Sequence, residues 1–419
     1  MKLSLLFFNN KASVLLTLSM LWVFFGFKIG VIPINGSLEH GVRLDDIVLI
    51  LLFSFLIIKK VDLMIIHPEI KYYFYFVIFS LASFLINFAL GNVDLGGVLY
   101  VVRLIEYMIF FYIGRYLTNS ELIDKFLIFY LLYLLFIMLA QKFLLLNIGV
   151  SFDNRPGGNL GGPWESAMVG SFLVFYFLSK KHYLFTLLAL IVVLMAASRI
   201  MVFAVFVVIF YNYFWKSNKI VSIVGLLSMI LLIGISDIEV LSRFLLLFQT
   251  DIFGLFDNYL EEIKALEMTR EGYFYNAYEV LNINAMSDDG DASTLIRVFR
   301  WLYLVMITFN SNIAILIGSG PSFASLAVDG YYVRVFTETG LIGLGFFIWF
   351  LSKIYRYFYS YCKFMSYYLI VLIITALFLD DFVAFKPMMF LWLFLGVAAQ
   401  KNNLSFKKFE IEQLGEKKK

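Results

Sequence analysis

Four arginines stand in polar breaks of an otherwise apolar sequence, where their side chains could bind an anion. Arg155 lies in the segment DNRPGGNLGGPWES (153–166), and Arg199 follows a tight turn, MAAS, at the start of an apolar run. Arg297 and Arg300, in STLIRVFRWLYLV, are three residues apart and share one helical face. A planar guanidinium binds phosphate oxygens through two parallel hydrogen bonds. The pattern favours a phosphate site, although arginines at a membrane surface also bind lipid headgroups or anchor a helix there.

Two acids follow these arginines and could move a proton. Asp329 comes directly before an expected helix in IGSGPSFASLAVDGYYVRVFTETGLIGLG, and Glu338 lies nine residues further on. A carboxylate in such a place can act as a general base or simply cap the helix. Tyr331 and Tyr332 are close to Asp329, and aromatic rings are suited to stacking against a sugar. We include all four residues in the candidate site.

A further charged pair, Arg103 and Glu106 in VVRLIEYMIFFYIG, lies within an apolar run and on one helical face. Charges inside a membrane are costly, so such residues either brace the helix bundle as a pair or bind a substrate.

Metal chemistry is not expected from the sequence. The aspartate pairs 45–46, 288–289 and 380–381 have no neighbouring third ligand, and we interpret them as solvated loop residues. The three histidines and the single cysteine do not form a zinc motif, and no nucleotide-binding glycine loop is present. We predict no metal and no cofactor.

The elements that must position these residues are membrane helices. The chain has 419 residues, of which 62% are hydrophobic and 15% are charged. Apolar runs of about 20 residues, the length that crosses a bilayer, recur throughout. We predict an all-α membrane protein with about 12 spans, at 13–34, 44–58, 71–90, 95–114, 122–146, 163–179, 183–197, 199–215, 220–236, 336–352, 364–379 and 386–399.

The basic residues indicate which connections are cytoplasmic. With these spans, both termini and every second connection lie on one face of the membrane. That face holds 20 of the 33 basic residues, and 18 of the 20 are lysine. The positive-inside rule makes that face cytoplasmic. Ten basic residues lie on the other face, and eight of these are arginine: Arg43, Arg155, Arg199, Arg243, Arg270, Arg297, Arg300 and Arg334. This excess of arginine indicates that an anion is handled at the outer face.

The chain divides into a bundle of nine helices at 1–236, a large outer segment at 237–335, three closing helices at 336–400 and a cytoplasmic tail at 401–419. Apolar residues at helical spacing at the start of the outer segment predict interfacial helices. The run WLYLVMITFNSNIAILIG (301–318) is interrupted by Asn310, Ser311 and Asn312, and we do not expect it to be a full span.

Over nearly its whole length, the chain resembles the O-antigen polymerase and ligase family of bacterial surface-polysaccharide assembly. The matching pieces are, in order, RLIEY, RPGGNLGGP, SRIMVF, a large outer segment ending in RVFRW, IGSGPSF and VDGYYVRVFTETGLIGL. The resemblance implies glycan transfer at the periplasmic face of the inner membrane. It implies undecaprenyl-pyrophosphate-linked oligosaccharides as donor and acceptor, with membrane lipids, a chain-length regulator and a flippase as partners and no nucleic acid.

Ligases of this family typically carry a histidine in the motif after the large outer segment, and Asp329 stands at that place here. This departure favours the polymerase branch. In the resulting hypothesis, Arg199, Arg297 and Arg300 hold the pyrophosphate, with Arg155 as a further contact. Asp329 takes the proton of the acceptor hydroxyl or orients the acceptor.

Three alternatives remain open at this stage. The chain could be a ligase that transfers the polysaccharide to lipid A core. Twelve spans with both termini inside also suit a lipid-linked oligosaccharide flippase or another transporter, although a large one-sided outer segment suits it less. A scaffold that recruits other assembly enzymes is the third, and the arginine-rich outer face argues mildly against it.

Overall fold

The computed structural model describes residues 24–27, 30–34, 37–58, 70–116, 120–144, 151–152, 155–214, 260–266, 268–280, 292–324 and 328–416. The predicted span at 220–236, most of the first span and the beginning of the outer segment lie outside these residues. So do Arg243 and the Asp288–Asp289 pair.

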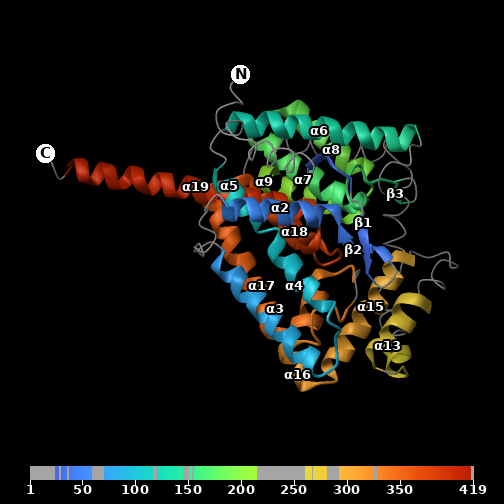
Figure 1. The fold of residues 1–419 in the computed structure, drawn as a ribbon. Helices are drawn as coiled ribbons and strands as arrows, with labels where there is room; N and C mark the ends of the chain where they lie inside the picture. The colour runs from blue at the N-terminus through green and yellow to red at the C-terminus, as the bar shows by residue number, and fades with distance from the viewer. Residues whose placement is uncertain are drawn as a thin grey trace.

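The described part of the chain is mostly helical (Figure 1). Its N-terminal helices are α2 (Leu44–Ile58), α3 (Lys71–Ala89), α4 (Gly97–Glu106), α5 (Ile109–Tyr116), α6 (Ser120–Phe143), α7 (Pro163–Ser179), α8 (Tyr183–Met195) and α9 (Arg199–Phe214). The segment 237–335, which the sequence predicts to lie outside, contributes α13 (Arg270–Gly272), the π-helix η2 (Tyr273–Val280), α15 (Ala292–Phe309) and α16 (Asn312–Ile317). The chain closes with α17 (Tyr331–Tyr361), α18 (Lys363–Thr375), the short 3₁₀ helix η3 (Asp381–Val383) and α19 (Phe385–Glu416).

Two short hairpins accompany the helices. Strand β1 (Gly30–Ile34) pairs antiparallel with β2 (Ser37–Arg43), and β3 (Ser151–Phe152) pairs with β4 (Arg155–Pro156). The predicted helix at 13–34 is therefore wrong at its C-terminal end. The sequence GVIPI favours an extended chain because three of its residues are β-branched and its proline cannot continue a helix.

Four of the described helical segments are long and apolar enough to cross a membrane: Lys71–Ala89, Gly97–Arg115, Glu121–Phe143 and Tyr331–Tyr361. Gly97–Arg115 comprises α4 and most of α5, where the sequence predicted one helix at 95–114. The interrupted run at 301–318 forms the end of α15 and α16, separated at Asn310 and Ser311, as its polar residues predicted. The tail is helical to Glu416, where only a solvated end was expected.

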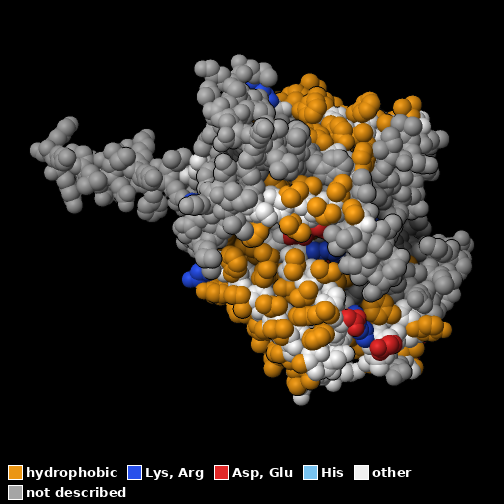
Figure 2. All heavy atoms as spheres, viewed as in Figure 1, with side chains coloured by type: hydrophobic (Ala, Val, Ile, Leu, Met, Phe, Trp, Pro, Cys, Tyr) orange, Lys and Arg blue, Asp and Glu red, His pale blue; other side chains and the backbone are white. Residues whose placement is uncertain are grey.

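Apolar side chains lie on the outside of these helices as well as inside. On α6, Phe129 and Phe136 are 61% and 67% exposed, whereas Tyr130 and Leu134 are fully buried. On α3, Ile78 is 61% exposed. Figure 2 shows a broad apolar surface over α3 and α17 with few charged side chains. An apolar surface of this extent is typical of helices that contact lipid rather than water.

The interior depends on close contacts between helices. Gly114 on α5 and Gly396 on α19 face each other's backbone, and a Cβ added to Gly114 would lie 2.0 Å from the carbonyl oxygen of Leu393. The same addition at Gly396 would lie 2.0 Å from the carbonyl oxygen of Phe111. Small residues commonly allow membrane helices to approach this closely. This contact fixes α19 against α5.

Helix α17 begins at Tyr331, five residues before the predicted start of the tenth span, and bends at Gly340. Gly340 has φ +66°, which favours glycine, and the backbone of α16 lies against it. Beyond α16, the main-chain amides of Ser319 and Gly320 donate to the carbonyl oxygens of Thr337 and Glu338, at 2.7 and 3.1 Å. The bend therefore brings the segment after α16 beside the first turns of α17, where it pairs with the helix backbone.

Replacing Gly340 with alanine is expected to destabilise the fold by about 2 kcal/mol or more, because alanine is strained at positive φ. The new Cβ would also lie 2.3 Å from the carbonyl oxygen of Leu316. The apparent Tm of the purified protein in detergent measures the effect. Gly345→Ala, further along the same helix with nothing within 4 Å of its added Cβ, is the matched control and should change the Tm little. Equal Tm values for the two variants would show that alanine is not strained at position 340.

Candidate functional site

Helix α15 carries two of the predicted arginines to one end of the bundle, where α15 packs against α17. Arg300 is 5% exposed and the Arg297 side chain is 19% exposed. Trp301, the next residue on the helix, donates from its indole Nε1 to the carbonyl oxygen of Val328, at 3.2 Å. This bond ties α15 to the segment that precedes α17, and so fixes both arginines relative to Asp329.

Asp329 lies beside Arg297, 32 residues away in the sequence. The Arg297 Nε atom is 3.4 Å from Asp329 Oδ2, and the Asp329 side chain is 36% exposed. The described residues give Arg297 Nε no hydrogen bond, so the pair is an ion pair without an aligned hydrogen bond. Asp329 has φ +55°, an uncommon conformation for a residue with a side chain. A carboxylate that solvent can reach, beside a guanidinium, can exchange protons with a ligand.

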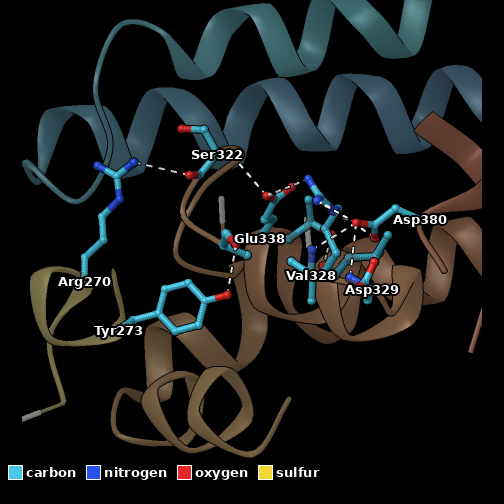
Figure 3. Close-up of polar contacts among 11 residues, drawn as sticks. Arg270, Tyr273, Ser322, Val328, Asp329, Glu338 and Asp380 are labelled. Carbon is cyan, nitrogen blue, oxygen red and sulfur yellow. Dashed lines mark hydrogen bonds and ion pairs between the residues drawn. The ribbon is translucent and has the colours of Figure 1, made fainter. Parts of the chain in front are cut away.

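Asp380, which follows α18, supports the Asp329 segment from inside. Its Oδ2 atom accepts hydrogen bonds from the main-chain amides of Val328 and Asp329, at 3.0 and 3.3 Å (Figure 3). Arg334 binds the same carboxylate with two donors, Nε to Oδ1 at 3.2 Å and Nη2 to Oδ2 at 2.8 Å. The interpretation of Asp380 as a solvated loop residue is wrong, since it is 7% exposed and Arg334 is 3% exposed.

Glu338 continues this network on the next turn of α17. Its Oε1 is 3.8 Å from Nη1 of Arg334 and accepts a hydrogen bond from the main-chain amide of Ser322 at 3.2 Å. A cavity beside Glu338 and Arg334 has room for about two water molecules. Its lining also includes Ser80 and Tyr100. The acid is 7% exposed, so in this structure it organises the backbone rather than facing the open site.

Arg270 of α13 extends the network to the surface. Its Nη2 donates to the carbonyl oxygen of Ser322 at 3.2 Å, and its Nη1 is 3.1 Å from Oδ2 of Asp94, which lies between α3 and α4. Figure 3 shows Arg270 and Ser322 at one end and Asp380 at the other, with Glu338 between them. Arg270 thereby connects α13 to Ser322, whose main-chain amide binds Glu338.

The two tyrosines differ in exposure: Tyr331 is buried, too deep to stack against a sugar, and Tyr332 is half-buried. Tyr331 is 2% exposed, and its ring packs against Phe347 and Phe382 with centroids 5.1 and 5.4 Å away. The Tyr332 hydroxyl donates to the carbonyl oxygen of Ile373 at 3.1 Å. The structure therefore gives both residues a role in packing α17 against its neighbours.

The charged pair on α4 also differs from the simplest expectation. Arg103 is half-buried, with its guanidinium carbon 5.9 Å from the centroid of the Tyr100 ring. Among the described residues, the ion pairs do not include one between Arg103 and Glu106. Neither residue makes a described contact with the Arg334–Asp380 network, although Arg103 is three residues from Tyr100 in the cavity wall.

Arg155 and Arg199 lie on other elements. Arg155 is half-buried in β4, and Arg199 is the half-buried first residue of α9. No described contact joins either arginine to Arg297 or Asp329. The four predicted arginines thus divide into two on α15, of which Arg297 lies beside Asp329, and two on other elements.

The glycine-rich segment after Arg155 is fixed by buried polar side chains. Lys386, 4% exposed at the start of α19, donates from Nζ to the carbonyl oxygens of Phe24, Gly26 and Asn159, at 3.1, 3.0 and 3.0 Å. Gln141 on α6 accepts from the main-chain amide of Gly158 at 2.7 Å and donates to its carbonyl oxygen at 3.0 Å. These bonds hold the segment against α6 and the start of α19.

Glu165, the acid of the same segment, lies in the first turn of α7. Its Oε2 accepts a hydrogen bond from the main-chain amide of Gly161, at 2.9 Å. Acids in the first turn also interact favourably with the positive end of the helix dipole. Glu165 is 1% exposed and holds the backbone turn that starts α7.

Asp381, the neighbour of Asp380, is fully buried and accepts a hydrogen bond from the Thr375 hydroxyl. Burial raises the pKa of the Asp381 carboxyl well above its usual value, and the nearby Asp380 raises it further. The earlier interpretation of this residue as a solvated loop acid is also wrong. A group buried in this way favours its neutral form.

The raised pKa of Asp381 predicts a stability that depends on pH. The contribution of Asp381 to the free energy of unfolding is complete below the pKa of an unfolded aspartate, about 3.9. This contribution is lost as the pH rises toward the pKa of Asp381 in the folded protein. Asp381→Asn, which is neutral and of equal size, should weaken this decline and raise the apparent Tm at pH 8 by about 1–3 °C. Thermal unfolding in detergent at pH 5 and pH 8 measures it. Parallel pH profiles for parent and variant would contradict the prediction.

Among the described residues, no group of three or more His, Cys, Asp or Glu side chains is arranged to hold a metal ion. No protein-family model matches the chain, and no curated protein matches it. The sequence motifs suggest membership in a polysaccharide polymerase family, and this membership is therefore a proposal.

Sequence reasoning identified Arg297, Arg300, Asp329 and Glu338 but not the role of Asp380. The available signal was its place in the sequence, directly after a predicted span and on the same predicted face as Asp329. Arg334 was recognised only as one of eight outer arginines. Arg334 and Glu338 are four positions apart, and this spacing puts them on one face of a helix.

Proposed function

We propose that this chain polymerises lipid-linked oligosaccharide repeat units at the outer face of a bacterial inner membrane. The growing saccharide would move from undecaprenyl pyrophosphate to the next lipid-linked unit. The observation that carries the proposal is the pairing of Arg297 with Asp329, with Arg300 one helical turn away. A cationic pair beside an accessible carboxylate is the minimum that such a transfer requires.

The chemistry requires two complementary groups. A hydroxyl oxygen of the acceptor forms a bond to the anomeric carbon of the donor saccharide, and the bond from that carbon to the pyrophosphate oxygen breaks. The hydroxyl proton passes to the Asp329 carboxylate, and undecaprenyl pyrophosphate leaves with its additional negative charge. Arg297 and Arg300 stabilise this charge, since guanidinium groups bind phosphate oxygens in pairs.

Contacts between helix ends support the proposed sidedness. Near connections expected in the cytoplasm, Nζ of Lys180, which directly follows α7, lies 3.3 Å from Oδ2 of Asp124 on α6, and the Lys353 amine lies 5.3 Å from the centroid of the Tyr72 ring. At the opposite ends, Gln141 binds Gly158 and Arg270 binds Asp94. Each of these contacts joins segments that the positive-inside rule assigns to one face.

The proposed substrate also fits the membrane setting. An activated donor that arrives already linked to a lipid needs no nucleotide site, and the bundle offers broad apolar surfaces along α3 and α6. The membrane lipids would surround these surfaces, while the saccharide meets the polar end where α13, α15 and the start of α17 come together. A flippase that delivers the units and a chain-length regulator are the expected partners.

Deletion of the coding sequence, followed by gel analysis of surface polysaccharide, tests this proposal. We expect the ladder of long chains to disappear and single repeat units to remain on the outer surface, with the ladder restored by a plasmid copy. Lipid-linked units that accumulate inside the cell would instead indicate a flippase. Long chains present on undecaprenyl pyrophosphate but absent from lipid A core would indicate a ligase. An unchanged ladder would exclude the polymerase.

A further inference from the structure

The main-chain conformation at Asp329 depends on a carboxylate 51 residues later in the chain. Two consecutive amides, those of Val328 and Asp329, both point at Oδ2 of Asp380, at 3.0 and 3.3 Å. Consecutive amides directed at one point form a concave anion site, and here the protein fills that site with its own acid. The left-handed φ of +55° at Asp329 is part of this arrangement.

A buried guanidinium fixes the orientation of the Asp380 carboxylate. Arg334 contacts both carboxylate oxygens through Nε and Nη2, at 3.2 and 2.8 Å, and its Nη1 is 3.8 Å from Glu338. A two-point contact of this kind restrains rotation of the carboxylate, which a lysine ammonium cannot do. Oδ2 is thereby kept in position for the two amides.

The segment is tethered on its other side as well. The amide of Tyr331 donates to the carbonyl oxygens of Ala376 and Leu379, at 2.8 and 3.3 Å, just before Asp380. Three main-chain amides of this segment, those of Val328, Asp329 and Tyr331, are therefore bound to residues of the turn after α18. The Asp329 side chain is left on the accessible side, where it meets Arg297.

We propose that Asp380, oriented by Arg334, is a positioning residue that holds the Asp329 carboxylate in place for proton transfer. This inference rests on the proposed function, in which Asp329 receives the acceptor proton. Asp380 contacts the Asp329 backbone and none of the reacting groups, so it acts through Asp329. The competing explanation is that the Arg334–Asp380 pair only joins α17 to the turn after α18.

Amide hydrogen exchange tests the backbone contact independently of activity. In the purified full-length protein in lipid nanodiscs, Asp380→Asn should speed exchange in a peptide covering residues 325–332 by about tenfold or more, because the amides lose a charged acceptor. Asp381→Asn is the matched control, since it makes the same change at the next residue, which does not contact these amides. Unchanged exchange in Asp380→Asn would overturn the proposal.

Kinetics test the consequence for catalysis. The substrate is the pool of lipid-linked units extracted from the deletion strain, added to the protein in liposomes. Asp380→Asn should lower kcat by about 100-fold, because a small displacement of a catalytic group is costly, and should change KM less than about threefold. If Asp329→Asn is inactive and Asp380→Asn keeps the parental kcat, the proposal is overturned. An active Asp329→Asn would instead contradict the proposed role of Asp329, and the exchange result would still stand.

A charge exchange separates positioning from simple bracing. The double variant Arg334→Asp with Asp380→Arg restores an ion pair but places no acceptor before the Val328 and Asp329 amides. We expect it to unfold at a higher temperature than either single variant while kcat stays at least about 30-fold below that of the parent. Recovery of kcat along with stability would overturn the proposal. If the double variant does not fold, the Asp380→Asn and Asp381→Asn pair decides the question.

Discussion

Replacing Asp329 with asparagine is expected to slow chain elongation by about 10²–10⁴-fold, the range for loss of a general base. Asparagine has the same size and is one of the few residues that tolerate the left-handed conformation seen here, so the backbone should not change. The proton acceptor is lost, and the ion pair with Arg297 is lost with it. Chain-length analysis in the complemented deletion strain measures the effect.

The control for this variant is Glu121→Gln, an equivalent loss of charge at an exposed residue near the start of α6. We expect this control to restore a parental ladder. Both variants must reach the membrane in parental amounts, as judged by immunoblotting of an epitope tag. A normal ladder from Asp329→Asn at parental protein levels would show that Asp329 is not the proton acceptor.

Removing either arginine of α15 is expected to have an effect of similar size. Arg300→Ala and Arg297→Ala should each reduce elongation by about 10²–10³-fold, comparable with removal of one donor to a developing negative charge. Lysine at either position keeps the charge but loses the planar pair of donors, so Arg297→Lys should retain an intermediate activity. Arg356→Ala, an exposed arginine near the far end of α17, is the matched control.

Arg300 is 5% exposed, so its variants need a stability measurement besides the gel. The prediction is loss of elongation with the protein still present in the membrane, and the apparent Tm separates this loss from a loss of stability. Long, normal ladders from the alanine variants would contradict the idea that these arginines bind pyrophosphate.

Arg199→Ala extends the same experiment to a second element. Arg199 begins α9, where free main-chain amides and the helix dipole favour an anion. Loss of elongation in this variant would place α9 in the phosphate site together with α15. A parental ladder would restrict that site to the α15 cluster.

Much of the helical arrangement follows from local sequence. The apolar runs at 44–58, 71–90 and 163–179 are close to the bounds of α2, α3 and α7, because a run of this composition is stable in a membrane chiefly as a helix. The break at Asn310 and Ser311 is also a local effect, since polar side chains that bind the backbone interrupt a helix. The shared face of Arg297 and Arg300 follows from their spacing alone.

Other features could not be obtained from local patterns. The strand at Gly30–Ile34 exists because a second strand pairs with it, and Tyr331 is buried because Phe347 and Phe382 lie against it. The bend at Gly340 depends on the backbone of α16, which lies against α17 at this residue. Each depends on a partner from another segment, so no periodicity within the segment itself could indicate it.

The site combines both kinds of information. The sequence by itself determined which residue types were present, an arginine pair on one helical face and an acid before the next helix. Only the tertiary structure decided that Asp329 meets Arg297 and that Asp380 and Arg334 lie beneath it, although the two aspartates are 51 positions apart in the sequence. The physical reason is that helical spacing is fixed within one turn, whereas contacts between distant segments depend on how whole helices pack.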